Sequence, residues 1–127
     1  MHALRNKILL ALVTLVSLLC CSCQKDDDKT FDIYKTWKVS SVSREGEQVS
    51  EHQAVGDLYD FQKGGTCRVT RHATGNNESL TWSYDEKEQV LYLDDIRYEV
   101  YKTENKAFDF GQIVNGKDVG TLHLVPR

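Results

Sequence analysis

The side chains that could carry acid–base, nucleophilic or metal chemistry are few and lie far apart along the chain. His52, His72 and His123 are the histidines beyond the N-terminal segment, and no two of them have the short spacing of metal ligands. The sequence contains neither the Gly-x-Ser-x-Gly motif of serine hydrolases nor the His-Glu-x-x-His motif of zinc proteases. We therefore expect solvated histidines, and we predict no catalytic residue, no metal site and no cofactor.

Two acidic clusters are the remaining candidates for chemistry. Asp94-Asp95 and the group of Asp85, Glu86 and Glu88 could act as paired carboxylates in acid–base catalysis or could bind calcium. Both clusters fall in predicted hairpin turns, where Asp and Glu are common and solvated. We interpret them as turn residues, and we expect that the protein is not an enzyme.

The N-terminal segment has the pattern of a bacterial export signal. Arg5 and Lys7 form a positive start, and residues 8–19 (ILLALVTLVSLL) form a mostly apolar stretch of 12 residues. A helix needs about 20 apolar residues to span a bilayer, so this stretch is too short for a permanent membrane anchor. The pattern predicts a signal peptide over residues 1–22.

The cysteines that follow the apolar stretch resemble the lipobox of bacterial lipoproteins. Cys23 is preceded by the small residue Ser22, which suits cleavage just before a cysteine that has received a diacylglycerol. Cys21 is the alternative, with Leu18 three positions before it but Cys20 at the cleavage point. The resemblance implies that Cys23 is lipidated and that acyl chains such as palmitate hold the protein on a membrane.

The charged run after the lipidation site bears on where the protein is anchored. Position 24 is Gln rather than the Asp that retains lipoproteins in the inner membrane. The run is Gln24, Lys25, Asp26, Asp27 and Asp28, and it resembles the acidic export tag of surface lipoproteins in the Bacteroidota. The resemblance implies an outer-membrane protein exposed on the cell surface, with the periplasmic face as the alternative. Short charged runs also act as solvated tethers, and we assign residues 23–30 to a lipidated, charged tether.

Composition narrows the class of partner. From Cys23 onward the chain has 105 residues with 14 basic and 19 acidic side chains, which gives a net charge of −5. Nucleic-acid binding rests on a basic face, so this balance argues against a nucleic-acid partner. Cys67 is the only cysteine beyond the lipidation segment, so we expect no intramolecular disulfide and predict that Cys67 lies in the core. We expect one domain and a monomer.

From residue 31 onward most of the chain alternates apolar and polar residues with a period of two, which is typical of half-buried β-strands. The eight apolar series that we interpret as strands are Trp37 with Val39, Tyr59 with Phe61, Cys67 with Val69, Leu80 with Trp82 and Tyr84, Leu91 with Leu93, Tyr98 with Val100, Phe108 with Phe110, and Leu122 with Leu124. Turn signals such as Lys63-Gly64-Gly65 and Asn115-Gly116 separate them. The pattern predicts an all-β fold, a small antiparallel up-and-down barrel of about eight strands, with a β-sandwich as the alternative.

Four short motifs resemble the small lipocalin-like lipoproteins of the Bacteroidota. The motifs are Thr36-Trp37-Lys38-Val39, Tyr59-x-Phe61 before Gly64-Gly65-Thr66, Trp82-x-Tyr84, and Leu91-x-Leu93. The likeness covers residues 31–127 and implies one lipocalin-like β-barrel domain. It implies no particular ligand.

The interior of the predicted barrel is the first place to look for binding. An eight-stranded barrel is just wide enough to be filled by side chains or to hold one small ligand. Trp37, Trp82, Tyr84 and Tyr98 are the candidate lining of an apolar ligand pocket near one mouth. The competing interpretation is that the many large rings fill the interior.

The segment Arg44–Gly56 is long for a plain connection between strands. Loops beyond about 12 residues without regular structure are often lids or binding loops. We expect this segment to hold a short helix near Ser50–Ala54 or to form a flap over one barrel mouth.

These observations lead to two hypotheses about function. The first is non-enzymatic binding of a small apolar ligand by the lipocalin-like domain. The alternative is an interaction protein that docks a partner, as an inhibitor or as an accessory subunit of a surface complex, through outward rings such as Tyr92 and Tyr101.

Overall fold

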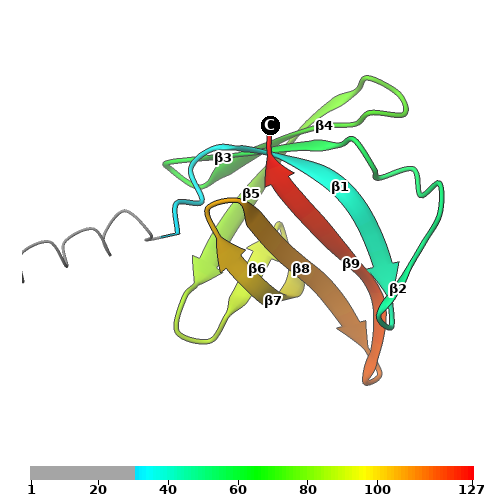
Figure 1. The fold of residues 1–127 in the computed structure, drawn as a ribbon. Helices are drawn as coiled ribbons and strands as arrows, with labels where there is room; N and C mark the ends of the chain where they lie inside the picture. Colours follow the sequence, from blue (N-terminus) through cyan, green and yellow to red (C-terminus); the bar gives the residue numbers. More distant parts are fainter. Residues whose placement is uncertain (1–30) are drawn as a thin grey trace, which may run out of the picture. The chain divides into compact units, whose positions relative to one another are not determined.

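The computed structural model describes residues 31–127. Nine strands follow one another along the chain (Figure 1): β1 (Thr36–Arg44), β2 (Glu47–Gln48), β3 (Leu58–Gln62), β4 (Thr66–Thr70), β5 (Asn77–Asp85), β6 (Val90–Leu93), β7 (Ile96–Glu104), β8 (Ala107–Val114) and β9 (Lys117–Pro126). The predicted signal peptide, the lipidation site Cys23 and the run Gln24 to Asp28 lie outside the described residues. No helix within residues 31–127 is long and apolar enough to cross a membrane.

The strands form one antiparallel sheet whose two ends meet. The sheet order is β2-β1-β3-β4-β5-β6-β7-β8-β9, and β1 also pairs with β9. Figure 1 shows β1 beside β9 at this closing seam. There Val39 lies opposite Leu124, and Val42 lies opposite Leu122. The predicted all-β antiparallel fold is confirmed, and its single sheet closes in a barrel-like ring.

The alternating pattern places large aromatic side chains in the interior of the closed sheet. Trp37, Phe61, Phe108 and Phe110 are each at most 1% exposed. The ring centroids of Trp37 and Phe108 are 5.4 Å apart, and those of Phe108 and Phe110 are 5.2 Å apart. Tilted pairs at these distances are favourable for aromatic side chains. Cys67 is a free, fully buried cysteine, as predicted.

The hairpin predicted at Asn115-Gly116 joins β8 to β9. Both residues have positive φ, 53° for Asn115 and 77° for Gly116. Two-residue hairpin turns of type I′ require positive φ at both central positions, and Asn-Gly meets this requirement with little strain. The turn sets the register in which Val114 lies opposite Lys117.

The segment between β1 and β3 differs from the expectation. It contains the additional strand β2. Of the two alternatives for this segment, the short helix near Ser50–Ala54 is wrong, because these residues lie in turns. Glu51 has a φ of 54° and Gly56 a φ of 93°, and neither value fits a right-handed helix. The segment also bonds to β1, since the Gly56 N–H donates to the Val39 carbonyl at 2.9 Å.

Candidate functional site

A cavity lies where β3 begins and β4 ends. It has a volume of about 420 Å³ and is lined by His52, Gln53, Ala54, Asp57, Arg71, Ala73 and Thr74. Two segments form its wall, namely the turns before β3 and the turn between β4 and β5. Its volume falls in the range of about 300–1,000 Å³ that is usual for small-molecule sites.

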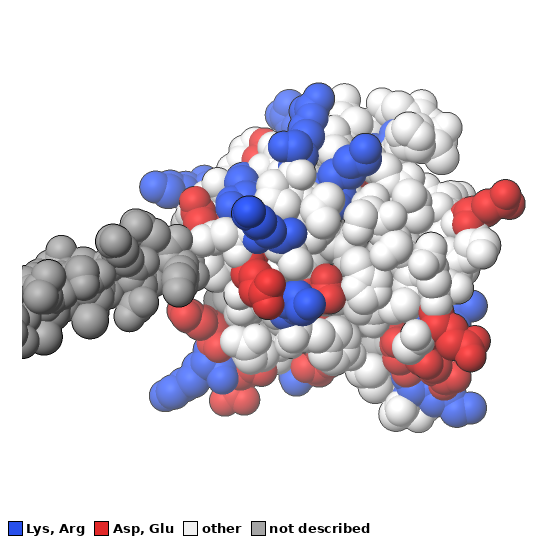
Figure 2. All heavy atoms as spheres, in the orientation of Figure 1, with Lys and Arg blue, Asp and Glu red and all other residues white. Residues whose placement is uncertain are grey.

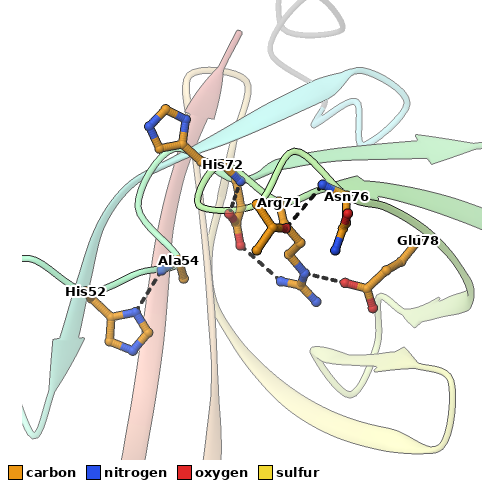
Figure 3. A network of polar contacts seen from close by, with 8 residues as sticks. His52, Ala54, Arg71, His72, Asn76 and Glu78 are labelled. Atoms are coloured by element: carbon orange, nitrogen blue, oxygen red, sulfur yellow. Dashed lines mark hydrogen bonds and ion pairs between the residues drawn. The ribbon is translucent and has the colours of Figure 1, made fainter.

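A buried carboxylate is part of the cavity wall. Asp57 is 2% exposed and precedes the first residue of β3. Its Oδ1 accepts a hydrogen bond from the His72 backbone N–H at 2.8 Å, and its Oδ2 accepts one from Arg71 Nη1 at 3.0 Å (Figure 3). Removing a carboxylate from water costs several kcal/mol unless the charge is paired and bonded. Asp57 meets both conditions.

Arg71 joins this carboxylate to a second one. Its Nε donates to Glu78 of β5, while its Nη1 bonds to Asp57 (Figure 3). The hydrogen bond to Glu78 raises the pKa of Arg71, and the bond to Asp57 raises it further. The guanidinium therefore stays charged and fixed between two carboxylates, with about a third of its side chain exposed.

Strand register places Asp57 and Arg71 together. The β3–β4 pairing runs from Gln62 opposite Thr66 to Leu58 opposite Thr70, so the next residues outward, Asp57 and Arg71, face each other. Both residues also continue the inward-facing phase of their strands. The charged pair thus occupies two inward-facing positions at the ends of β3 and β4, where the apolar core ends and the cavity begins.

Turns hold the two cavity walls in place. In the first wall, the Ala54 N–H donates to His52 Nδ1 at 3.0 Å, and the Asp57 N–H donates to the Ala54 carbonyl at 3.0 Å. A Cβ on Gly56 would lie 2.7 Å from Cγ of His72, so glycine is required for this close approach to the second wall. The second wall is held by the Arg71 N–H, which donates to the Asn76 carbonyl at 2.8 Å. The Asn76 N–H in turn donates to Thr74 Oγ1 at 3.2 Å (Figure 3).

Two tyrosines connect the charged pair to the aromatic core. Burial raises the pKa of Tyr59 to about 12, and the nearby Arg71 charge partly opposes this rise. Burial also raises the pKa of Tyr98, and Arg71 again opposes it. Both rings pack edge-on against Phe110, with centroid distances of 6.0 Å for Tyr59 and 5.4 Å for Tyr98.

The raised pKa of Tyr59 predicts a loss of stability at alkaline pH. Below pH 10 the tyrosine is neutral in both the folded and the unfolded chain, so its contribution is fully present. Between pH 10 and about 12 only the unfolded chain ionises, and the loss reaches about 2–3 kcal/mol at 1.36 kcal/mol per pKa unit. Urea unfolding of the wild type and of Tyr59→Phe from pH 8 to 12 measures this loss. The variant should show a shallower decline, and identical pH slopes for the two proteins would contradict the assignment.

The four predicted pocket residues are spread over the sheet. Tyr98 lies near Arg71, as described above. Trp37 is fully buried, whereas Trp82 and Tyr84 are half-buried on β5. Trp82 Nε1 donates to the Gln62 carbonyl at 3.0 Å, at the end of β3 opposite the cavity. The structure does not bring these rings together around the cavity, and their role as ligand contacts stays a prediction.

The arrangement suits binding more than acid–base chemistry. Both oxygens of Asp57 are engaged by donors, so the carboxylate forms a fixed polar wall beside the methyl groups of Ala54 and Ala73. Within residues 31–127 no three His, Cys, Asp or Glu side chains form a group that could hold a metal ion. No protein-family model, curated protein or solved structure matches this chain.

Proposed function

We propose that the chain is a lipoprotein of the outer membrane, exposed on the cell surface, whose domain over residues 31–127 binds a small ligand without catalysing a reaction. The anchor follows from the sequence pattern of a signal peptide, the lipobox cysteine Cys23 and the acidic run after it. The domain contributes a preformed cavity.

The observation that carries the binding proposal is a cavity of about 420 Å³ with a fixed ion pair in its wall. A preformed site binds with less entropy cost than one that must be ordered by its ligand. Ala54 and Ala73 offer apolar contact, while Arg71 and Thr74 offer polar groups. We propose a small ligand with an apolar body and one hydrogen-bonding end.

Partner docking is the second candidate function, and exposed apolar side chains favour it. Tyr92 and Ile96 lie on the β6–β7 hairpin and are 38% and 45% exposed, and Tyr101 of β7 is 51% exposed. Exposed aromatic residues are enriched at protein interfaces. This surface would serve an inhibitor or an accessory subunit of a surface complex.

Charge distribution supports the proposal that no nucleic acid is bound. Figure 2 shows basic and acidic side chains beside one another on the same face, with uncharged areas between the charged groups. Nucleic-acid binding is usually accompanied by a continuous basic patch or stripe. We propose a monomer as the anchored unit.

Filling the cavity tests the binding proposal. Ala73 lines the cavity and is exposed, so Ala73→Trp should occlude it with little effect on folding. Residues 24–127 are titrated with fatty acids, retinoids and haem, and binding is followed by calorimetry. We expect saturable binding of at least one compound at micromolar concentration, weakened at least about tenfold, or 1.4 kcal/mol, by Ala73→Trp.

The matched control is Thr66→Trp, at the exposed start of β4 and away from the cavity, which should bind like the wild type. Equal binding by all three proteins would place the ligand elsewhere. No binding of any compound in the panel would contradict the ligand-binding proposal and favour partner docking.

The anchor has its own test. Cys23→Ala removes the thiol that accepts the lipid, so the protein should no longer partition with membranes and should remain unprocessed or become soluble. Fractionation of cells, with metabolic labelling by a palmitate analogue, measures both effects. A processed, membrane-bound Cys23→Ala protein, together with loss of labelling in Cys21→Ala, would assign the lipid to Cys21 instead.

A further inference from the structure

A second polar cluster lies on the outer face of the sheet, where β1, β9 and β8 are neighbours. Ser43 Oγ is 2.7 Å from His123 Nε2, and His123 Nδ1 is 3.1 Å from Asp109 Oδ2. The sheet register explains this geometry, because Asp109 lies directly opposite His123, and Ser43 lies opposite Thr121, two residues before His123 on the same strand. The three side chains thus form a continuous chain across three strands.

A bulge in β1 helps to place the serine. The register shifts between Val39 and Ser41, so Val39 and Val42 both point into the core although they are three residues apart. Ser43 therefore returns to the outer face beside the histidine. The Ser40 hydroxyl, also on β1, donates to the His123 carbonyl at 2.9 Å and ties the two strands together.

The partners of His123 define where its proton lies when the imidazole is neutral. A carboxylate only accepts hydrogen bonds, so Asp109 requires the proton on Nδ1. Nε2 then has a free lone pair and accepts the Ser43 hydroxyl proton. These are the orientations in which a histidine acts as a general base toward a serine.

We propose that Ser43 is a covalent acylation site, in which His123 is the base and Asp109 is the residue that positions the base. The substrate class is an activated carboxylic ester. The side chains of His123 and Asp109 are 33% and 17% exposed, so the cluster is open to solvent on one side. This inference goes beyond the proposed ligand binding and concerns residues outside the lining of the cavity.

The reaction balances with the ester as the only co-reactant. A bond forms between Ser43 Oγ and the ester carbonyl carbon, and the hydroxyl proton passes to His123 Nε2. The bond from the carbonyl carbon to the leaving oxygen then breaks, and the leaving group departs with its electron pair and takes up the proton from His123. The products are an acylated Ser43 and a free alcohol or phenol.

The sheet position of Ser43 predicts a long-lived acyl group. Ser43 is paired with Thr121 of β9 on one side and with Gln48 of β2 on the other, so its backbone belongs to the sheet. Hydrolases stabilise the oxyanion with free backbone N–H groups, and losing one such donor slows reaction about 100- to 1,000-fold. The lack of such donors slows both acylation and hydrolysis, since each step passes through an oxyanion. An activated ester has a better leaving group than the acylated serine, so we expect a single burst of acylation followed by slower hydrolysis rather than rapid turnover.

The test uses the full lipidated chain in phosphatidylethanolamine vesicles and p-nitrophenyl acetate as the probe. Release of p-nitrophenolate is followed with time, and peptide mapping by mass spectrometry locates the acetyl group. We expect a burst of about one equivalent, with the acetyl group on Ser43. Ser43→Ala should abolish the burst, and His123→Gln should slow it about 100-fold, the usual contribution of a general base.

Further variants separate chemistry from folding. Ser41→Ala, at the residue opposite His123, is the matched control and should keep the burst. Asp109→Ala should slow the burst more than about tenfold, and Asp109→Glu should restore part of the rate. His123→Asn is made alongside His123→Gln, and each variant is checked by its melting temperature. Acetylation only at other residues, no acetylation, or acetylation of Ser43 at an unchanged rate in both folded His123 variants would overturn the proposal.

Discussion

Replacing Trp37 by alanine is expected to lower the free energy of unfolding by about 3–5 kcal/mol, the usual cost of deleting a large buried aromatic side chain. Trp37 is 0% exposed and lies within 5.8 Å of Phe31 and 5.4 Å of Phe108, measured between ring centroids. Its Nε1 also donates to the Ile33 carbonyl at 3.1 Å. Trp37→Ala therefore leaves a cavity among the aromatic rings. It also removes one of the two hydrogen bonds that the Ile33 carbonyl accepts, while the bond from the Lys35 N–H at 2.8 Å remains. Urea unfolding of residues 24–127 measures the change.

The control for this prediction is an aromatic residue on the outer face. Tyr92 of β6 is 38% exposed, so Tyr92→Ala should change the free energy of unfolding by less than about 1 kcal/mol. Similar losses for Trp37→Ala and Tyr92→Ala would contradict the inward placement of Trp37.

Replacing Asp57 by alanine is expected to cost about 3–4 kcal/mol, toward the lower end of the range for breaking a buried ion pair. The change removes both hydrogen bonds that the carboxylate accepts and leaves the His72 N–H without its acceptor. Arg71 keeps its bond to Glu78, which moderates the loss. Chemical unfolding at pH 7 measures the change.

Glu78→Gln is the matched variant at the other end of the same guanidinium. The Glu78 side chain is 44% exposed, and exposed ion pairs contribute about 0–1 kcal/mol. We therefore expect Asp57→Ala to be far more damaging than Glu78→Gln. The reverse order would contradict the assignment of Asp57 as the buried anchor of the cavity wall.

The sequence predicted most of the strands because burial on one face leaves a period-two pattern. Phe108 and Phe110 of β8 show this clearly, since both are fully buried and flank the half-buried Asp109. Strand β2 left no such pattern because its two residues, Glu47 and Gln48, are both exposed. The helix near Ser50–Ala54, one of the two alternatives for this segment, was wrong, because nothing in the sequence marked the left-handed backbone of Glu51.

The candidate site was predicted only in part. The long segment Arg44–Gly56 was expected to be a lid or binding loop, and it supplies His52, Gln53 and Ala54 to the cavity lining. The ion pair in the wall was not predicted, because its residues come together only through strand pairing. Asp57 and Arg71 are 14 positions apart, and each looks like an ordinary polar residue beside a strand. A signal was present, since a tight β3–β4 turn at Gly64-Gly65 implies a register that places Asp57 opposite Arg71. Asp57 and Arg71 also occupy positions that face inward by the alternation of β3 and β4, where an apolar residue would be usual.

The cluster of Ser43, His123 and Asp109 on the outer face depends on strand pairings between residues even farther apart in the sequence. Ser43 and His123 are 80 positions apart and meet only because β1 closes the ring against β9. His123 was expected to be solvated, whereas its ring contacts both Ser43 and Asp109. Sequence spacing carries no information about a contact that requires closure of the whole sheet.

The central claim is that the cavity between the turns at residues 52–57 and the turn after β4 is a ligand site. The most direct measurement is nuclear magnetic resonance of isotope-labelled residues 24–127 during titration with the tightest ligand of the panel. We predict that the largest shifts fall on the amides of residues 52–57 and 71–74 and on the Arg71 Nε–H, because these two segments carry the residues that line the cavity. Shifts centred instead on Trp82 and Gln62, at the opposite end of β3, or on the β6–β7 hairpin at Tyr92 would contradict it.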